Sequence, residues 1–268
     1  MIRPVASLTL SLAVLWSASS ALAACQNPQQ AEIYPTARIL PENLLRIYVY
    51  FPRPMNPDHG LTHVRLVDAA GGTVEGAFLS NREDLWSPDR RRLTLILDPG
   101  RVKTGLQAHE ALGRALEPGE GYAFEVSGNA LGADGCALGM DTRHSFTVAS
   151  ADLEPPDPAS WGLSVPKAQS TEPLEVTLGS THDHLSLAFR LRVLDDTGAV
   201  VRGSISLGPN EESWEFKPSA PWADAVYTLA IDERLEDLAG NRPGLLFDRP
   251  LDQAPAAWDR RLAFTPLK

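Results

Sequence analysis

The chain has 268 residues, a length typical of about two domains. Its 24 Lys and Arg against 34 Asp and Glu give a net charge of -10 at pH 7, which argues against nucleic acid as a partner because polyanion binding depends on clustered cations. With 43% hydrophobic and 22% charged residues, the composition is that of a globular protein and excludes a disordered chain or a polytopic membrane protein. The 22 Pro and 20 Gly are spread along the chain, which favours many short strands joined by tight turns.

Residues 1–24 have the pattern of a secretory signal peptide. Arg3 precedes an apolar run from Val5 to Trp16, which is too short to span a membrane, and small residues follow it. Two cleavage sites compete there. Ala21-Leu22-Ala23 is an ordinary signal peptidase site, whereas Leu22-Ala23-Ala24-Cys25 resembles the bacterial lipobox, which we favour.

The lipobox resemblance implies that Cys25 is diacylated and becomes the mature N-terminus. Gln26 in the next position implies sorting to the outer membrane, with a soluble periplasmic or secreted protein as the alternative. If cleavage occurs at the ordinary site instead, a disulfide between Cys25 and Cys136 can tie the N-terminal segment to the rest of the chain. No other segment approaches a membrane span, so we expect membrane contact only through an N-terminal lipid.

An internal repeat divides the chain into two similar halves. The following segments align between the halves: Ile47–Phe51 with Leu174–Leu178, Val67–Gly76 with Leu194–Gly203, Trp86 with Trp214, Tyr122–Val126 with Tyr227–Ile231, and Arg143–Thr147 with Arg261–Thr265. A change of offset places about 22 extra residues in the first copy, near residues 98–116. We expect this insertion to be a recognition loop, because long loops on a rigid scaffold commonly carry binding.

Each half contains about seven strand candidates with alternating apolar residues, and no long amphipathic helix follows any of them. The clearest candidates are Leu45–Phe51, Leu93–Leu97, Tyr122–Val126, Leu185–Leu191 and Tyr227–Ile231. This pattern predicts an all-β protein of two tandem immunoglobulin-like β-sandwiches. We expect a tether at residues 25–34, one domain at 35–150, a stiff Pro-rich linker at 151–160 and a second domain at 161–268.

Several motifs resemble the SbsA-type bacterial Ig-like domain. Phe51-Pro-Arg-Pro-Met-Asn56 is similar to the end of the family's opening strand, and Tyr227–Ile231 followed by Leu235-Glu-Asp-Leu-Ala-Gly-Asn241 is similar to its late strand and turn. The second copy departs from the pattern at Gly179–Asp183 and the first at Asn129–Cys136. The resemblance implies a secreted or surface protein that acts as a spacer or an adhesion-like module, with no catalytic residues.

Met55, His59 and His63 are candidate metal ligands, since thioether and imidazole groups suit copper or zinc. The repeat places His182 and His184 at the corresponding point of the second copy, where a strand would direct both side chains to one face. Solvated loop histidines are the simpler interpretation, because spacing identifies no third or fourth ligand. We therefore expect no cofactor, with a periplasmic copper or zinc protein as the alternative.

Trp86 and the run Arg90, Arg91 and Arg92 occupy a predicted hairpin and are candidate contacts for a glycan or an anionic polymer. Hydrolase motifs such as Gly-x-Ser-x-Gly are absent from the sequence, so we expect no enzyme. The prediction is a non-enzymatic structural or interaction module of the cell envelope, with an envelope protein or glycan as partner. A polysaccharide-binding accessory protein is a further alternative.

Overall fold

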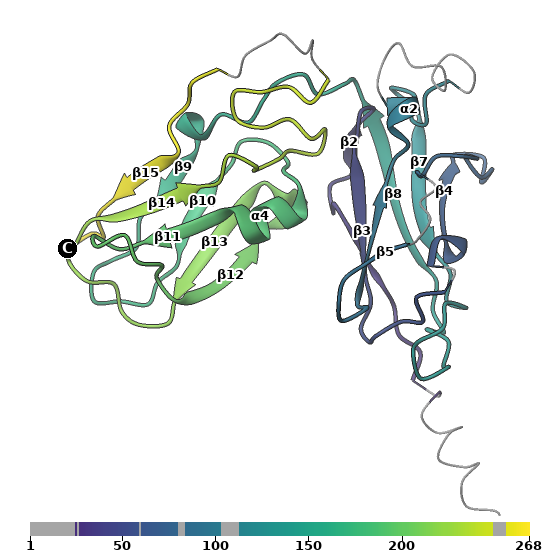
Figure 1. The fold of residues 1–268 in the computed structure, drawn as a ribbon, viewed down its shortest axis with the longest axis horizontal. Helices are drawn as coiled ribbons and strands as arrows, with labels where there is room; N and C mark the ends of the chain where they lie inside the picture. Colours follow the sequence, from purple (N-terminus) through teal and green to yellow (C-terminus); the bar gives the residue numbers. More distant parts are fainter. Residues whose placement is uncertain (1–24, 26, 59, 80–83, 103–112, 249–255) are drawn as a thin grey trace, which may run out of the picture.

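The computed structural model describes residues 25, 27–58, 60–79, 84–102, 113–248 and 256–268. The chain forms two β-sandwich domains that lie side by side, with the connection between them at one end (Figure 1). The strands of domain 1 are β1 (Glu32–Tyr34), β2 (Ile39–Pro41), β3 (Arg46–Tyr50), β4 (Val64–Asp68), β5 (Leu85–Trp86), β6 (Arg92–Ile96), β7 (Gly121–Val126) and β8 (Thr142–Ala149). Those of domain 2 are β9 (Gly162–Ser164), β10 (Leu174–Thr177), β11 (Leu191–Leu194), β12 (Gly203–Leu207), β13 (Ser213–Pro218), β14 (Tyr227–Ile231) and β15 (Arg261–Phe264).

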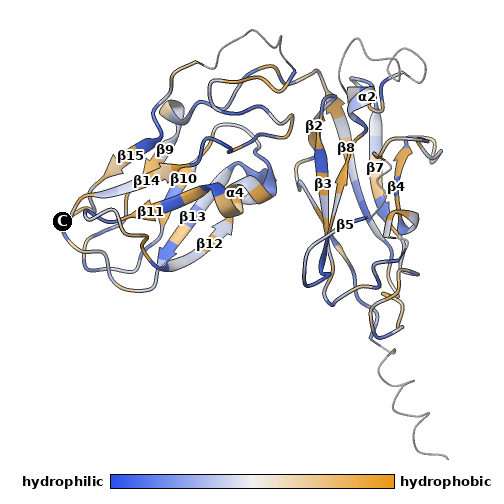
Figure 2. Ribbon diagram, in the orientation of Figure 1, coloured by the Kyte–Doolittle hydropathy of each residue, from blue (hydrophilic) through white to orange (hydrophobic). Residues whose placement is uncertain are grey.

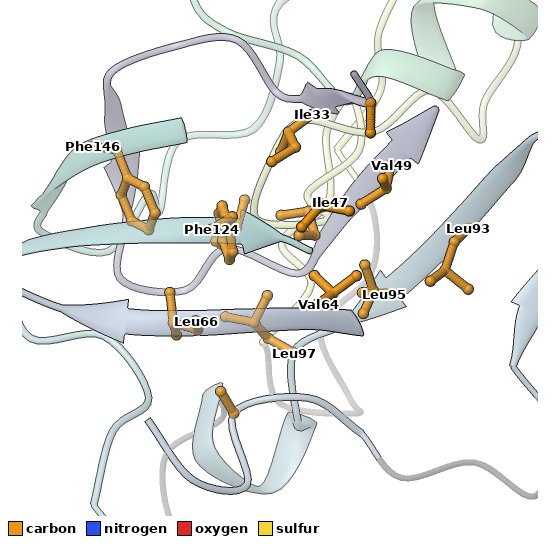
Figure 3. Close-up of a cluster of buried hydrophobic side chains, with 14 of the residues drawn as sticks. Ile33, Ile47, Val49, Val64, Leu66, Leu93, Leu95, Leu97, Phe124 and Phe146 are labelled. Carbon is orange, nitrogen blue, oxygen red and sulfur yellow. The ribbon is translucent and has the colours of Figure 1, made fainter. Parts of the chain in front are cut away.

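Domain 1 packs a sheet of order β1-β3-β6-β5 against a sheet of order β2-β8-β7-β4. The strands are antiparallel neighbours except for β2 and β8, which run parallel. Alternation along each strand directs one set of apolar side chains inward, where those of the two sheets meet (Figure 3). Ile47 and Val49 of β3 face Phe124 of β7 in this core, and all three are fully buried.

Domain 2 repeats the arrangement with sheets of order β12-β13-β10-β9 and β11-β14-β15. Its core is richer in aromatic rings. Trp214 stacks on Phe216 at 5.9 Å, and Trp222 meets Tyr227 edge to face at 4.9 Å between ring centroids. Both domains are therefore all-β sandwiches, which confirms the predicted fold class.

The internal repeat is visible in the hydrogen bonds as well as in the topology. Asp68 and Asp195 each accept two backbone N–H bonds from the turn that follows β4 or β11. The hydroxyl groups of Tyr122 and Tyr227 each accept a backbone N–H bond from a residue shortly before their own strand. These equivalences explain why the same residues recur in both halves. In both turns the aspartate side chain serves as the hydrogen-bond acceptor for the backbone N–H groups of the turn itself.

Three local features differ from expectation. The tether predicted at residues 25–34 is part of domain 1 at its end, because β1 pairs with β3 and Ile33 is buried in the core. The strand predicted at Leu185–Leu191 is absent, because the helix α4 (His184–Arg190) occupies this segment up to Arg190, and β11 begins at Leu191. The alignment of Trp86 with Trp214 does not hold, because Trp86 lies on β5 at a sheet edge, whereas Trp214 lies on the central strand β13.

Helices are few and short. In addition to α4, the described residues contain α2 (Pro99–Val102) and the 3-10 helices η1 (Gly60–His63), η2 (Pro158–Ser160) and η3 (Pro209–Glu211). Asp183 caps α4 by accepting a hydrogen bond from the Ser186 backbone N–H at 2.8 Å. No helix in the described part of the chain is long and apolar enough to cross a membrane.

Candidate functional site

The two domains meet where loops at one end of domain 2 pack on the outer face of the β1-β3-β6 sheet of domain 1. Tyr34, Tyr48 and Tyr50 point outward from this sheet, opposite to the core-facing residues of the same strands. The His184 ring at the start of α4 lies among them, 3.9 Å from Tyr34, 5.5 Å from Tyr50 and 6.3 Å from Tyr48 between ring centroids. A tyrosine-lined sheet face therefore receives a side chain of the other domain.

A network of charged and polar groups lies beneath these rings. The Tyr48 hydroxyl donates a 2.7 Å hydrogen bond to Asp183, whose side chain is almost fully buried. Arg46 approaches Asp183 at 3.8 Å and pairs with Glu236 at 2.5 Å, and Glu236 also accepts from Arg242 at 2.7 Å. The two arginines thus compensate two carboxylates that have lost most of their water.

Burial raises the pKa of Asp183, while the charge of Arg46 and the hydrogen bond from Tyr48 act in the opposite direction. Burial and the charge of Asp183 together raise the pKa of Tyr48, so its hydroxyl keeps its proton and donates. Tyr48 belongs to domain 1 and Asp183 to domain 2. Removing the Tyr48 hydroxyl would therefore take one hydrogen-bond donor from a buried carboxylate of the other domain.

Further hydrogen bonds cross the junction on either side of this network. The Thr36 backbone N–H donates to the buried carboxylate of Glu211 at 2.8 Å, and the Leu45 N–H donates to the Leu238 carbonyl at 2.8 Å. Leu238 belongs to the apolar cluster of domain 1 although it lies in a loop of domain 2. Gly240 has a φ of +80°, which favours glycine, and a Cβ atom there would lie 2.6 Å from the Leu45 side chain.

The predicted linker takes part in the same junction. The carbonyl of Asp152 accepts a hydrogen bond from Asn43 of domain 1 at 2.9 Å and another from Asn241 of domain 2 at 3.1 Å. Asp152 N–H also donates to the Asn43 side chain at 2.9 Å. The connector is therefore fixed to both domains at its first residues. Its prolines are only part of what restrains it.

A groove of about 700 Å³ opens beside this junction. Domain 1 contributes β1, the end of β3 and the β5–β6 hairpin, and domain 2 contributes Phe189 of α4, which is 56% exposed. Glu32, Tyr50 and Arg92 are cross-strand neighbours and form one row on the sheet face at the groove. Because Phe189 belongs to the other domain, the shape of the groove depends on how the two domains are held.

Arg91 and Arg92, two members of the predicted binding set, line this groove. The acidic groups beside them have other partners: Glu32 accepts from the Tyr34 hydroxyl at 2.8 Å, and Asp89 accepts from the Ser87 hydroxyl at 2.6 Å. The buried Nε of Arg92 has no hydrogen-bond acceptor among the described residues. The groove therefore combines two guanidinium groups and two carboxylates with the exposed ring of Phe189.

The other two members of the predicted binding set lie apart from this groove. Arg90 adopts a positive φ of 56° in the hairpin turn and is not among the groove-lining residues. Trp86 packs on Phe51 at 5.5 Å between ring centroids, and its Nε1 donates to the Pro57 carbonyl at 3.3 Å. Its ring lines a different and smaller cavity, so the structure separates Trp86 from the arginines.

That smaller cavity, of about 110 Å³, brings together Met55 and His63 from the first metal prediction. Met55 is 2% exposed and belongs to the core of domain 1, where its thioether packs against apolar neighbours. His59, the third member, lies outside the described residues. In the part of the chain that the structure describes, no group of three or more His, Cys, Asp or Glu could hold a metal ion.

His182 and His184 do not form a chelating pair, because the expected strand is the beginning of α4. His182 is fully buried beside Trp161, and one of its ring nitrogens lies 2.9 Å from the Ser180 carbonyl. His184 instead turns toward Tyr34 of the other domain. Burial lowers the pKa of His182 to about 4, so this side chain is a neutral core residue.

Cys25 forms a disulfide with Cys136 in the structure. A sulfur in a disulfide cannot also carry a thioether-linked lipid, so the bridge and the predicted lipidation of Cys25 are alternative forms of the chain, and lipidation stays a prediction. The alternative, in which the bridge ties the N-terminal segment to domain 1, describes the observed arrangement. Gln29 continues this attachment by donating its N–H to the Leu138 carbonyl at 2.6 Å.

Sequence reasoning missed the domain junction entirely. The alternation of tyrosines in Ile47-Tyr48-Val49-Tyr50 was a usable signal, because large rings on the outer face of a strand indicate that something covers that face. The predicted insertion at residues 98–116 lies partly outside the described residues. At its base, Arg101 donates hydrogen bonds to the carbonyls of Glu75 and Arg114.

No family model matches the chain, and no curated protein matches it. Among solved structures, the chain is similar to α-2-macroglobulin from Escherichia coli spanning domains MG0-NIE-MG1, with 12% identity over 92% of this chain and 74% of that chain, and a TM-score of 0.28. It is also similar to the tandem Ig repeats of Dlar (11% identity, 76% and 90% covered, TM-score 0.23) and to the FN1-FN3 domains of chicken CNTN1 (14%, 90% and 67%, 0.22). Identities and TM-scores this low say nothing about the activity of this chain. Its fold class is assigned from its own strand order.

Proposed function

We propose that this chain is a non-enzymatic structural or interaction protein of the cell envelope, in which two Ig-like domains act as one rigid unit. The observation that carries the proposal is the junction, where Asp183 of one domain is buried against Tyr48 and Arg46 of the other. A flexible pair of domains would leave these groups in water. Burying these groups between the domains fixes the orientation of one domain relative to the other, as a protein that presents surfaces of both domains together requires.

Export is part of the proposal. A disulfide between Cys25 and Cys136 is stable in an oxidising compartment such as the periplasm, and residues 1–24 have the pattern of a secretory signal. The resemblance to SbsA-type Ig-like domains agrees with an envelope location. In this form the N-terminus is attached to domain 1 by the bridge and not to a membrane by a lipid.

Two measurements test the disulfide-linked, exported form: the intact mass of the chain and the reactivity of its thiols. The chain is expressed with its N-terminal segment in a Gram-negative host. We expect a mature chain without added lipid mass, in which both cysteines react with a maleimide reagent only after reduction. A triacylated N-terminus together with a freely reactive Cys136 would contradict the disulfide-linked form. It would restore the outer-membrane lipoprotein as the account of this protein.

The groove is the surface that we propose for recognition. Guanidinium groups bind carboxylates through paired hydrogen bonds, and the exposed ring of Phe189 and the half-buried ring of Tyr50 add apolar contact. The ligand that we propose carries a carboxylate next to an apolar group or a sugar ring. An acidic peptide segment and a uronic acid glycan both carry this combination.

Fluorescence anisotropy with a labelled poly-glutamate peptide and with a labelled oligogalacturonate separates these two sources. We expect one of the probes to bind the intact chain and to lose at least tenfold in affinity in the double variant Arg91→Ala, Arg92→Ala. The matched control is Arg65→Ala, Arg143→Ala, which makes the same charge change on the β4 and β7–β8 side of domain 1. Equal loss in both double variants would indicate unspecific charge attraction and would refute the groove.

A further inference from the structure

One edge strand of domain 2 has a free row of backbone hydrogen-bonding groups. β12 is the last strand of its sheet and pairs only with β13. The Ser219 N–H donates to the Arg202 carbonyl and the Gly208 N–H to the Ser213 carbonyl, so the even-numbered residues of this segment bond to β13. The peptide groups of Gly203, Ile205 and Leu207 therefore point away from the sheet. The described residues offer them no hydrogen-bond partner.

The side chains of β12 show the same incompleteness. Ile205 lies opposite Phe216, which is buried in the core, so Ile205 is on the core-facing side of its sheet. It is nevertheless 40% exposed, because no strand lies beyond it. Ser204 and Ser206 alternate with it on the outer face and are exposed. A neighbouring strand would cover Ile205 and satisfy the free peptide groups at once.

Other edges of the two sandwiches carry features that oppose strand addition. β1 presents Glu32, β4 presents Arg65 and Asp68, β11 presents Arg192 and β15 presents Arg261, while β2 contains Pro41. β5 has only two residues, and β9, the opposite edge of the sheet that contains β12, has only three. β12 has five residues, Gly-Ser-Ile-Ser-Leu, without a charge or a proline. In Figure 2, β12 lacks the deep blue of a charged residue that interrupts β11.

We propose that β12 pairs with β12 of a second copy of this chain, antiparallel and centred on Ile205, and so joins two domain 2 sheets into one. This register places Ile205 opposite Ile205 of the partner copy and Gly203 opposite Leu207. All of these residues have outward-facing peptide groups, as backbone pairing across the new edge requires. The proposal concerns association between copies and does not depend on what the groove binds.

The same register is chemically self-complementary. On the core side the two Ile205 side chains would cover each other, and on the outer side Ser204 would face Ser206 of the partner copy. Arg202, the nearest charged residue before the strand, would face Gly208, so no like charges oppose one another along the seam. A two-fold axis needs this kind of self-matching surface. For that reason a second copy fits this edge better than a strand of another protein.

Sedimentation equilibrium of the purified chain, from low micromolar to near-millimolar concentration, tests the proposal. We expect a reversible monomer–dimer equilibrium in which Ile205→Lys weakens dimerisation at least tenfold. Ile205→Pro should do the same, because it removes an outward N–H and leaves the bonds to β13 intact. Ile39→Lys, at an apolar and 68% exposed position of the β2 edge, is the matched control and should dimerise like the wild type.

Oxidative cross-linking tests the register. Opposed residues of a hydrogen-bonded antiparallel pair lie about 5.5 Å apart between Cα atoms, which a disulfide can bridge. We expect Ile205→Cys to form a covalent dimer under mild oxidation and Ile39→Cys to remain monomeric. A chain that stays monomeric at all concentrations, a dimer that tolerates both Ile205 variants, or equal cross-linking of the two cysteine variants would each overturn the proposal. Loss of folding in a variant is detected separately by its thermal unfolding curve.

Discussion

Replacing Tyr48 by Phe isolates the contribution of the domain junction. The substitution removes only the hydroxyl, which lies in the junction and donates to Asp183 at 2.7 Å, while the ring and its packing on domain 1 remain. Asp183 is almost fully buried, so no water replaces the lost donor. A hydrogen bond to a buried charged group contributes about 1.5 to 3 kcal/mol, and we expect the free energy of unfolding to fall by about 2 kcal/mol.

Calorimetry and urea unfolding measure this change. If the two domains unfold as one cooperative unit, a loss of about 2 kcal/mol lowers the midpoint temperature by about 4 to 8 °C. If the junction opens first, the single transition of the wild type should split into two. Tyr122→Phe is the matched control, because its hydroxyl accepts a hydrogen bond from Glu117 within domain 1 and at its surface.

A double-mutant cycle with Asp183→Asn assigns the effect to the pair. Asn remains an effective helix cap, so α4 should keep its N-terminus while the charge is removed. We expect a coupling energy above about 1 kcal/mol between positions 48 and 183. If Tyr48→Phe is no more destabilising than Tyr122→Phe and the coupling is zero, the junction contributes nothing and the reasoning fails.

The remaining predictions concern burial, covalent linkage and close approach. Burial lowers the pKa of His182 to about 4 from a value near 6.5. Between these pH values the unfolded chain binds a proton at this side chain and the folded chain does not, so the free energy of unfolding falls as the pH drops from 6.5 to 4. His182→Asn should remove about 2 to 3 kcal/mol of this loss when urea unfolding is compared at pH 7 and pH 4.5, and an unchanged pH profile would contradict the burial. Reduction of the Cys25–Cys136 bridge should cost about 2 to 5 kcal/mol in urea unfolding, because it opens a loop spanning 111 residues, and equal stability with and without reductant would argue against a structural bridge. Gly240→Ala should lower the free energy of unfolding by at least about 1 kcal/mol, since φ is +80° there and the new Cβ would meet Leu45. A neutral result in thermal unfolding would contradict the close packing of this loop on Leu45.

Much of the architecture could be predicted because it depends on local pattern. The strand at Tyr227–Ile231 was predicted with its observed limits, since alternating burial and a tyrosine beside a turn are both visible in a single chain. The repeated turn at Asp68 and Asp195 was also visible, because such turns need the same residue types wherever they occur. These features need no knowledge of distant contacts.

The segment at residues 185–191 shows where local pattern misleads. Its apolar residues fit both a two-residue and a helical period. In the structure the helix α4 ends at Arg190, and Leu191 already belongs to β11. Asp183 before the segment was a capping signal that could have decided between them. The metal prediction for His182 and His184 depended on the strand and failed with it.

The junction and the groove could not be predicted from spacing, because their partners are far apart in the chain. Tyr48 and Asp183 are separated by 135 positions, and neither residue type is unusual alone. The groove likewise needs Phe189 of one domain and Arg91 of the other. Only the placement of the two sandwiches relative to each other creates both.

The distance distribution between one spin label on each domain tests the central claim, a fixed pair of domains, most directly. Exposed sites for the labels are Arg65 on β4 and Val226 before β14, and the described cysteines are both in the disulfide and do not react. We expect one narrow distribution for the wild type and a broad one when Tyr48→Phe and Asp183→Asn are combined. A broad distribution in the wild type would contradict the rigid unit and the function proposed from it.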